Sequence, residues 1–232
     1  MQRSFSSPAL VLRVRSSGES NREAVFLSAE EGLLSATLFG GPKSRLRSHV
    51  SPFNSGLLFT YRDPAKDFRK VSDFDVQSWR PGLRELYERS NIASQIAAEI
   101  LAGHGGGGAF SEAFVLANTA LDALSSADEA SCERIFIHFM WNWAGLLGNK
   151  SDLRHCASCA CEIESDAVIW FIPGEGFLCK NCIVTGKSAA VLGPGSRRWL
   201  LAVENKPPLE VSRILLDAES LGELKLLIKM QK

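Results

Sequence analysis

The sequence predicts an α+β protein in which a small antiparallel β-barrel precedes an α-helical domain that carries an inserted zinc module. Three observations support this fold class. Short apolar segments separated by turn residues fill the first 80 residues, the apolar period then lengthens from two to about 3.6 residues, and two Cys-x-x-Cys pairs follow. We therefore expect domains at residues 1–80 and 81–232, with the zinc module at about 154–184.

The strand segments are rich in β-prone apolar residues and end at glycine, proline or charged turns. They are 9–15, 24–27, 33–39, 56–61 and 71–79. Short strands at this spacing are typical of a small five-stranded barrel, and the OB-fold, which commonly binds single-stranded nucleic acid, has this pattern. An SH3-like barrel has the same pattern, so strand spacing alone does not separate the two.

Helical periodicity begins after Pro81. Leu83, Ile92 and Ile100 belong to one apolar face of a long helix, which the glycine-rich segment 103–108 ends. Aromatic residues of the third helical segment, and Cys132 beside them, are expected to be buried core residues. The later helical segments are 114–124, 129–147, 197–204, 209–216 and 221–230.

The Cys-x-x-Cys pairs are Cys156 with Cys159 and Cys179 with Cys182. Two such knuckles at this separation predict a tetrahedral Zn²⁺ site, because each turn delivers two thiolates to one point. Four thiolates close the coordination sphere, whereas catalytic zinc keeps one position open, so we expect a structural metal. The segment between the knuckles predicts a strand at 167–172 and a turn, as in a zinc ribbon.

Two neighbouring residues leave the ligand set open. His155 directly precedes Cys156, and Cys161 lies two residues beyond Cys159, so either side chain could replace one of the thiolates. We prefer the four Cys-x-x-Cys thiolates, because their symmetric spacing needs no rearrangement.

Charge is unevenly distributed along the chain. The totals balance at 26 basic and 26 acidic residues, which argues against a protein that coats nucleic acid with its whole surface. Residues 1–80, however, contain twelve Lys and Arg against eight Asp and Glu, whereas the remainder contains fourteen against eighteen. The barrel segment is therefore basic and the rest acidic.

A basic segment after the third strand is the candidate DNA-contacting loop. Lys43, Arg45 and Arg47 lie within residues 41–49, where loop cations can reach phosphates and nearby rings can stack on bases. The alternative is a solvated turn without a function. Residues that could extend the surface are Arg13, Arg15, Arg62, Lys66, Arg69, Lys70, Phe39, Phe53, Phe59 and Tyr61.

Enzyme and membrane signals are absent from the sequence. It contains no nucleophile elbow, paired-carboxylate motif or dinucleotide fingerprint. No apolar run reaches the roughly 18 residues that a membrane helix requires. We therefore expect a non-enzymatic cytoplasmic protein, whose reducing surroundings keep thiols available for zinc. An enzyme with a cryptic site is a weaker hypothesis.

Several short segments form a recognisable series along the chain. They are Val11-Leu12-Arg13-Val14-Arg15 with Gly18-Glu19-Ser20, Lys43-Ser44-Arg45-Leu46-Arg47 leading to Pro52-Phe53, Arg80-Pro81-Gly82-Leu83-Arg84, and Leu153 with the two Cys-x-x-Cys pairs. With this series the chain resembles, over nearly its whole length, the RecO family of bacterial recombination mediators, which are DNA repair proteins. It departs from the family at Ala160, where a glycine is common, and by the additional Cys161.

The resemblance implies an N-terminal OB-fold that binds single- and double-stranded DNA, and a helical C-terminal domain with structural Zn²⁺. Proteins of this family anneal complementary single strands and, with RecR, help load RecA onto DNA coated by single-strand-binding protein (SSB). They bind the acidic C-terminal tail of SSB, and a nucleoid-associated location follows.

Position by position, Lys43, Arg45 and Arg47 match the family's basic loop, and Arg13 and Arg15 are further candidates for DNA contacts. The alternative function is a protein–protein adaptor, in which the barrel and the zinc ribbon grip partners and DNA binding is incidental.

Overall fold

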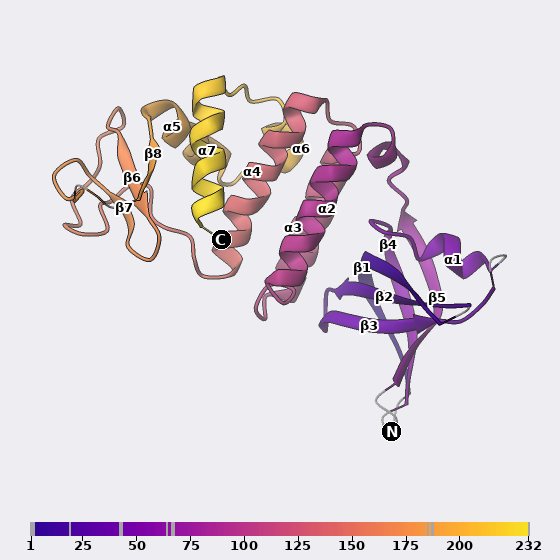
Figure 1. The fold of residues 1–232 in the computed structure, drawn as a ribbon. Coiled ribbons are helices and arrows are strands. Elements are labelled where there is room, and N and C mark those ends of the chain that lie inside the picture. Colours follow the sequence, from indigo (N-terminus) through magenta and orange to yellow (C-terminus); the bar gives the residue numbers. More distant parts are fainter. Residues whose placement is uncertain are drawn as a thin grey trace. The chain divides into compact units, whose positions relative to one another are not determined.

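The computed structural model describes residues 3–18, 20–41, 44–63, 65, 68–184, 186 and 188–231. By packing, the chain divides into two compact units, Met1–Ser126 and Ala127–Lys232. The first unit contains the barrel, a short helix, a 3₁₀ turn and two long helices, and the second contains the later helices and the segment with the cysteine pairs (Figure 1).

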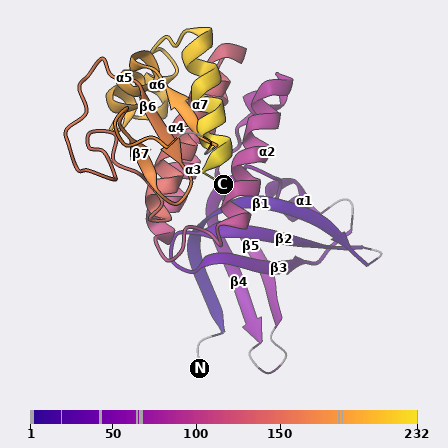
Figure 2. The same ribbon diagram turned by 60° about the vertical axis from the view of Figure 1, so that its left-hand side comes forward.

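The first unit begins with a closed barrel (Figure 1 and Figure 2). The strands pair in the order β1-β2-β3-β5-β4, and β4 also pairs with β1. All pairings are antiparallel except that of β3 with β5, because a ring with an odd number of strands cannot alternate throughout. The strands are β1 (Ser4–Ser17), β2 (Asn21–Ser28), β3 (Gly32–Leu38), β4 (Ser55–Asp63) and β5 (Phe68–Ser78).

A short helix, α1 (Arg45–His49), lies between β3 and β4. This strand order with a helix at this point is that of the OB-fold. The predicted OB-fold barrel is therefore confirmed, and the SH3-like alternative is wrong. Leu46 of α1 and the fully buried Val50 after it pack into the barrel core, in which Phe26 and Phe74 meet edge to face with ring centroids 6.0 Å apart.

Two helices of the first unit cover part of the outer barrel surface. After a 3₁₀ turn, η1 (Pro81–Arg84), come α2 (Tyr87–Ala102) and α3 (Phe110–Leu124). Helix α3 packs on β1 and β2, and α2 packs on β1. Leu10 and Leu27 are consequently fully buried although they lie outside the barrel core. The last barrel strand ends just before residue 80, and helices follow it. By packing, however, α2 and α3 belong to the same compact unit as the barrel.

The second unit combines helices with a small sheet. The sheet has the order β7-β6-β8 with antiparallel pairing, and the turn from β6 to β7 confirms the strand and turn expected between the knuckles. Helix α4 packs against α6 and α7. The elements are α4 (Glu129–Leu146), β6 (Ile169–Ile172), β7 (Gly176–Leu178), β8 (Ala190–Leu192), α5 (Pro194–Val203), α6 (Pro208–Val211) and α7 (Ala218–Met230).

Two details of the second unit differ from expectation. Strand β8 was not predicted, because three residues are too short to show a period. The helix expected at 209–216 is only the single turn α6. The carbonyl of Ser212 accepts hydrogen bonds from Ser131 Oγ at 3.0 Å and Arg134 Nη2 at 2.7 Å, so it bonds to α4 and not to a further helical turn.

Helix α4 supplies much of the core of the second unit. Phe139, Trp141 and Trp143 are buried, as is Cys132, and this confirms the packing role expected of the segment. Burial also lowers the pKa of His138 to about 4, so this imidazole is neutral at physiological pH. Neither α4 nor any other helix among the described residues is long and apolar enough to cross a membrane.

Candidate metal centre and nucleic-acid interface

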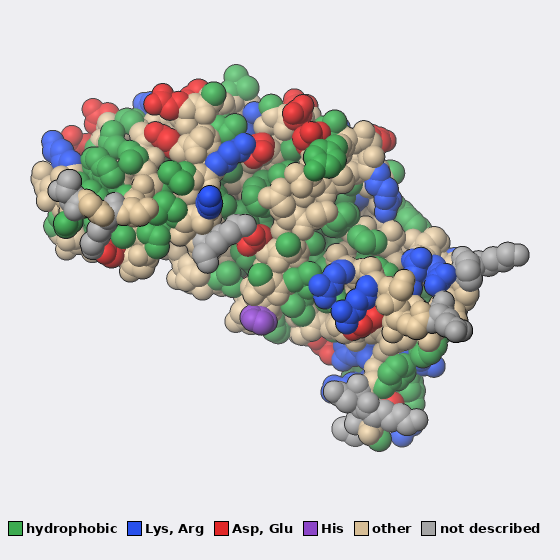
Figure 3. Space-filling model, in the orientation of Figure 1, with side chains coloured by type: hydrophobic (Ala, Val, Ile, Leu, Met, Phe, Trp, Pro, Cys, Tyr) green, Lys and Arg blue, Asp and Glu red, His purple; other side chains and the backbone are tan. Residues whose placement is uncertain are grey.

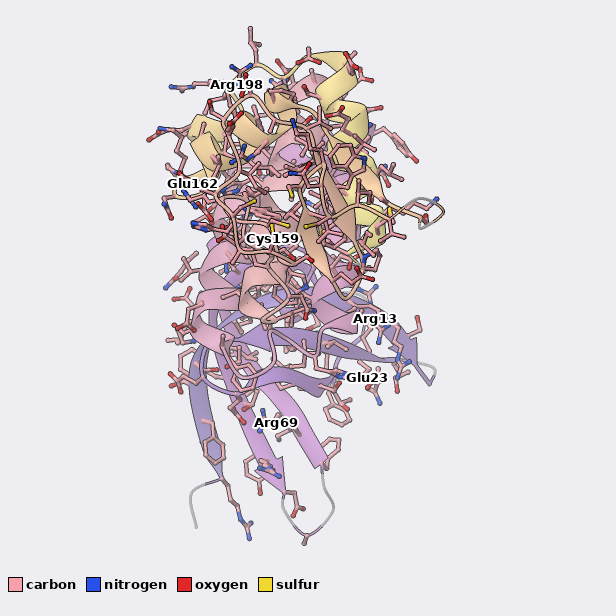
Figure 4. The ribbon with its side chains drawn as sticks, turned by 90° about the vertical axis from the view of Figure 1, so that its left-hand side faces the viewer. Arg13, Glu23, Arg69, Cys159, Glu162 and Arg198 are labelled. Atoms are coloured by element: carbon pink, nitrogen blue, oxygen red, sulfur yellow. The ribbon has the colours of Figure 1, made fainter. Side chains whose placement is uncertain are left out.

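The structure brings the thiols of Cys156, Cys159, Cys179 and Cys182 together. All of their Sγ atoms lie within 4.8 Å of one another. Zn–S bonds of about 2.3 Å in a tetrahedron separate neighbouring sulfur atoms by about 3.8 Å, and Cys159 Sγ lies 3.9 Å from Cys179 Sγ. Figure 4 shows Cys159 in the second unit with other sulfur atoms beside it. The four residues therefore fit the donor set of a Cys₄ metal site.

The first knuckle is a tight turn fastened to β7. Ala160 N donates to Cys156 O at 2.9 Å, which closes the turn, and Ala157 N donates to Phe177 O at 2.8 Å, which ties it to the strand. Ala160 has a φ of 57°, in the left-handed region that favours glycine. The second knuckle begins at Cys179, immediately after β7, so the β6–β7 hairpin places the two knuckles next to each other.

Backbone donors favour the thiolate form at the buried cysteine. Burial by itself raises the pKa of Cys156, but N–H groups of Cys159, Cys179 and Ser158 outweigh it and lower the pKa to about 6. Among them, Cys179 N donates to Cys156 Sγ over 3.4 Å. Because the thiolate is the form that binds metal, the backbone prepares this position for a cation.

Arg197 of α5 holds the base of the first knuckle. Its guanidinium is buried and donates to Leu153 O at 2.8 Å, to Ile163 O at 2.7 Å and to Glu164 O. Burial lowers the pKa of Arg197. The chain segments that enter and leave the knuckle are thus fixed to one side chain. The sequence offered no signal for this role, because the partners are main-chain carbonyls.

The two alternative ligands lie outside the group of four. His155 Nδ1 lies 2.7 Å from Asp152 Oδ2, so this ring nitrogen already has a carboxylate as its partner. Cys161 Sγ lies 3.3 Å from Cys159 Sγ, but Cys161 does not belong to the group in which every thiol is close to every other.

The candidate DNA-contacting residues lie on two elements of the barrel. Arg13 and Arg15 are exposed on β1, and Arg15 Nη2 forms an ion pair of 2.7 Å with Glu23 Oε2 on β2. In Figure 4, Arg13 and Glu23 lie at the same end of the barrel. Lys43 and Lys66 lie outside the described residues.

Arg45 and Arg47 belong to helix α1 and not to a loop, which corrects the sequence expectation. An OB-fold has a helix at this position, and Leu46 anchors it to the barrel core. Because the two arginines are two positions apart on a helix, their side chains leave in different directions. Arg47 Nη2 donates to Ser20 O in the β1–β2 turn at 3.1 Å, whereas Arg45 Nε donates to His49 Nε2 at 3.1 Å.

A band of outward residues runs around the barrel through successive strand pairings. Arg15 lies opposite Glu23, Glu23 opposite Thr37, Thr37 opposite Lys70, and Lys70 opposite Tyr61. Residues paired in this way lie on one face of the sheet, so the band joins the basic end of β1 to Tyr61 on β4.

Two cations flank the ring of Tyr61. Lys70 Nζ lies 5.1 Å from the ring centroid, and Arg3 Nη1 donates to the hydroxyl at 3.3 Å. Tyr61 and Lys70 were named from the sequence, whereas Arg3 was missed because it precedes the first expected strand. Figure 3 shows several Lys and Arg side chains exposed over the barrel.

These features define a class, namely OB-fold proteins with an appended helical unit that carries a four-cysteine, metal-type cluster. Comparison with family models agrees. "Recombination protein O N terminal" matches residues 1–78, and "Recombination protein O C terminal" matches residues 87–230. The chain belongs to the RecO family of DNA repair proteins.

Individual relatives are distant in sequence but similar over long stretches. The DNA repair protein RecO of Desulfitobacterium hafniense (strain DSM 10664 / DCB-2) is 27% identical over 193 residues, which are 81% of this chain and 67% of the relative. The DNA repair protein RecO of Pelotomaculum thermopropionicum is 25% identical over 227 residues, which are 97% of this chain and 86% of the relative. The DNA repair protein RecO of Heliobacterium modesticaldum is 26% identical over 236 aligned positions, which cover 98% of this chain and 83% of the relative.

Proposed function

We propose that this protein is a non-enzymatic, DNA-binding recombination mediator. In this role it anneals complementary single strands and, with RecR, helps load RecA onto single-stranded DNA coated by SSB. The observation that carries the DNA-binding part is the outward band on the OB-fold barrel. It offers the exposed Lys70, with Arg3 beside it, for phosphates and the ring of Tyr61 for a base. Such a surface binds without sequence preference, which suits a protein that acts wherever a gap occurs.

Annealing requires no covalent chemistry, because holding two strands while shielding their charge is sufficient. The partners RecR and the acidic SSB tail follow from membership in the family, and so does the nucleoid-associated location. Both single- and double-stranded DNA are proposed ligands, since phosphate contacts serve either.

We assign the four Cys-x-x-Cys residues as ligands of one structural Zn²⁺ ion. Cys156, Cys159, Cys179 and Cys182 would close its coordination sphere and fasten the two knuckles to each other. Such an ion supplies folding free energy to the second unit and leaves no open position for a water nucleophile.

The test is binding of a labelled single-stranded oligonucleotide across a salt series, with zinc content measured on each preparation. We compare the wild type with a Lys43→Ala, Arg45→Ala, Arg47→Ala triple variant and with the single variants Lys70→Ala, in the band, and Arg13→Ala. Three lost phosphate contacts reduce the log–log salt slope by about 2, and one reduces it by about 0.7. Arg15→Ala should have less effect than Arg13→Ala, because Glu23 already neutralises Arg15.

The matched control is Arg198→Ala, which removes an exposed arginine from the second unit. It should leave the slope unchanged. If the barrel variants bind like the wild type while Arg198→Ala weakens binding, the DNA site lies in the second unit. If the wild type does not bind DNA, the adaptor function replaces this proposal.

A further inference from the structure

We propose that Cys159 and Cys161 form an oxidation-sensitive thiol pair, and that a disulfide between them opens the metal centre. This inference rests on the proposed zinc site, since Cys159 is one of its four ligands. Cys161 is the one thiol of the cysteine-rich module that the site does not use, and it is exposed beside a ligand.

The backbone enforces the approach of the two thiols. Cys159 Sγ and Cys161 Sγ lie 3.3 Å apart, and a disulfide bond is about 2.0 Å long, so the two sulfur atoms are already neighbours before any bond forms. The intervening Ala160 has a left-handed φ of 57°, which turns the chain back on itself. Cys156 N donates to Cys161 O at 2.9 Å, and an antiparallel bridge of His155 with Glu162 flanks this bond.

Access separates this pair from the other thiols. Cys159 and Cys161 are both exposed, whereas Cys156 is buried and Cys179 and Cys182 are half-buried. A small oxidant such as hydrogen peroxide therefore reaches Cys159 before the other ligands. Reactivity of cysteine follows thiolate character and exposure, and a metal-bound ligand is a thiolate.

The chemistry balances with peroxide as the oxidant. The Cys159 thiolate attacks one peroxide oxygen and the O–O bond breaks, which gives a sulfenic acid and hydroxide. The sulfur of Cys161 then attacks Cys159 Sγ and displaces the sulfenic oxygen as hydroxide. The proton of the Cys161 thiol and one from solvent convert the two hydroxides to water. Two thiols thus lose two electrons in total, and one peroxide becomes two waters.

Formation of this bond removes one donor from the metal. A sulfur atom in a disulfide is no longer a thiolate, so the ion keeps three ligands and loses affinity. Reduction by a dithiol restores the thiolate and with it the site.

The experiment uses the full-length, zinc-loaded, reduced protein. Peroxide is added in steps, released zinc is followed with a chromophoric chelator, and the cross-linked peptides are mapped by mass spectrometry. The wild type should form the Cys159–Cys161 link and release zinc in parallel, and a dithiol with added Zn²⁺ should reverse both changes. Cys161→Ser should bind zinc before oxidation but lose the link and release zinc more slowly.

Cys132→Ala is the control, because it removes a buried thiol from α4 and leaves the module unchanged. It should behave like the wild type. Zinc release from Cys161→Ser at the wild-type rate, links among the four ligands instead, or a linked protein that retains its zinc would each overturn the inference. Reduced wild type that holds no zinc contradicts the proposed metal centre instead, and peptide mapping still shows whether the pair forms.

Discussion

One residue of the first knuckle has a backbone conformation that its residue type disfavours. This residue is Ala160, whose φ is 57°. In this left-handed conformation the Cβ of alanine is crowded by the backbone, whereas glycine has no Cβ. The strain persists because the surrounding hydrogen bonds, including Cys156 N to Cys161 O, determine the turn. A side chain is therefore tolerated at this position at a cost in stability.

Ala160→Gly should stabilise the zinc-loaded protein by about 1 kcal/mol, because glycine adopts this conformation without strain. Urea denaturation measures the change. Ala157→Gly is the matched control in the same knuckle, where φ is not positive, and it should destabilise the protein by about 0.5–1 kcal/mol. Destabilisation by both variants would show that Ala160 is not strained.

Among elements, the barrel and α3 are joined through one buried guanidinium. Arg80 Nε donates to Asp122 Oδ1 at 2.6 Å, and Nη2 donates to Asn118 Oδ1 at 2.7 Å, both on α3. Its Nη1 donates to Phe53 O at 2.6 Å, just before β4. A planar fork with several fixed donors can satisfy these partners at once, whereas a single ammonium cannot.

Arg80→Lys should therefore lower the free energy of unfolding by about 2–3 kcal/mol, since several acceptors around this buried side chain lose their donors. Urea denaturation followed by circular dichroism measures this loss. Arg84→Lys is the control: its guanidinium is exposed and donates to Ser51 Oγ at 3.1 Å. That change should stay within about 0.5 kcal/mol. An equal decrease in the free energy of unfolding for the two variants would contradict the role of Arg80 in joining the barrel to α3.

At the scale of the whole molecule, all six cysteines lie in the second compact unit, and the first unit has none. Any thiolate-bound metal can therefore contribute directly only to the folding of residues 127–232. The barrel is stabilised by its own apolar core and by α2 and α3.

Removal of the proposed metal should accordingly affect one unit more than the other. With a strong chelator and a reducing agent, we expect faster amide hydrogen exchange in β6, β7 and both knuckles, because on the order of 10 kcal/mol of metal-binding free energy is lost. Exchange in the strands of the barrel should be unchanged. Mass spectrometry of peptides measures both regions, and added Zn²⁺ is the control that should restore protection. Equal loss of protection in the barrel would contradict the separate roles of the two units.

Local patterns in the sequence determined the five barrel strands, the long helices and the two knuckles. Periods of two and 3.6 residues report which side chains face a core, and the Cys-x-x-Cys spacing positions two thiols within one turn. The same patterns could not reveal β8, which is only three residues long, or choose between an OB-fold and an SH3-like barrel. For the site, the grouping of four thiols was foreseeable, whereas their metal and the DNA contacts stay proposals.

Only the tertiary structure decided how strands β3 and β5 close the barrel, and that α1 directs Arg45 and Arg47 to different sides. It also decided the roles of Arg80 and Arg197, whose guanidiniums bond to main-chain carbonyls distant in sequence. Arg45 donates to the side chain of His49, but for the other three arginines and for the β3–β5 pairing the physical reason is the same. A main-chain carbonyl is present at every residue and leaves no mark in the sequence, so its partner is determined only when the chain has folded.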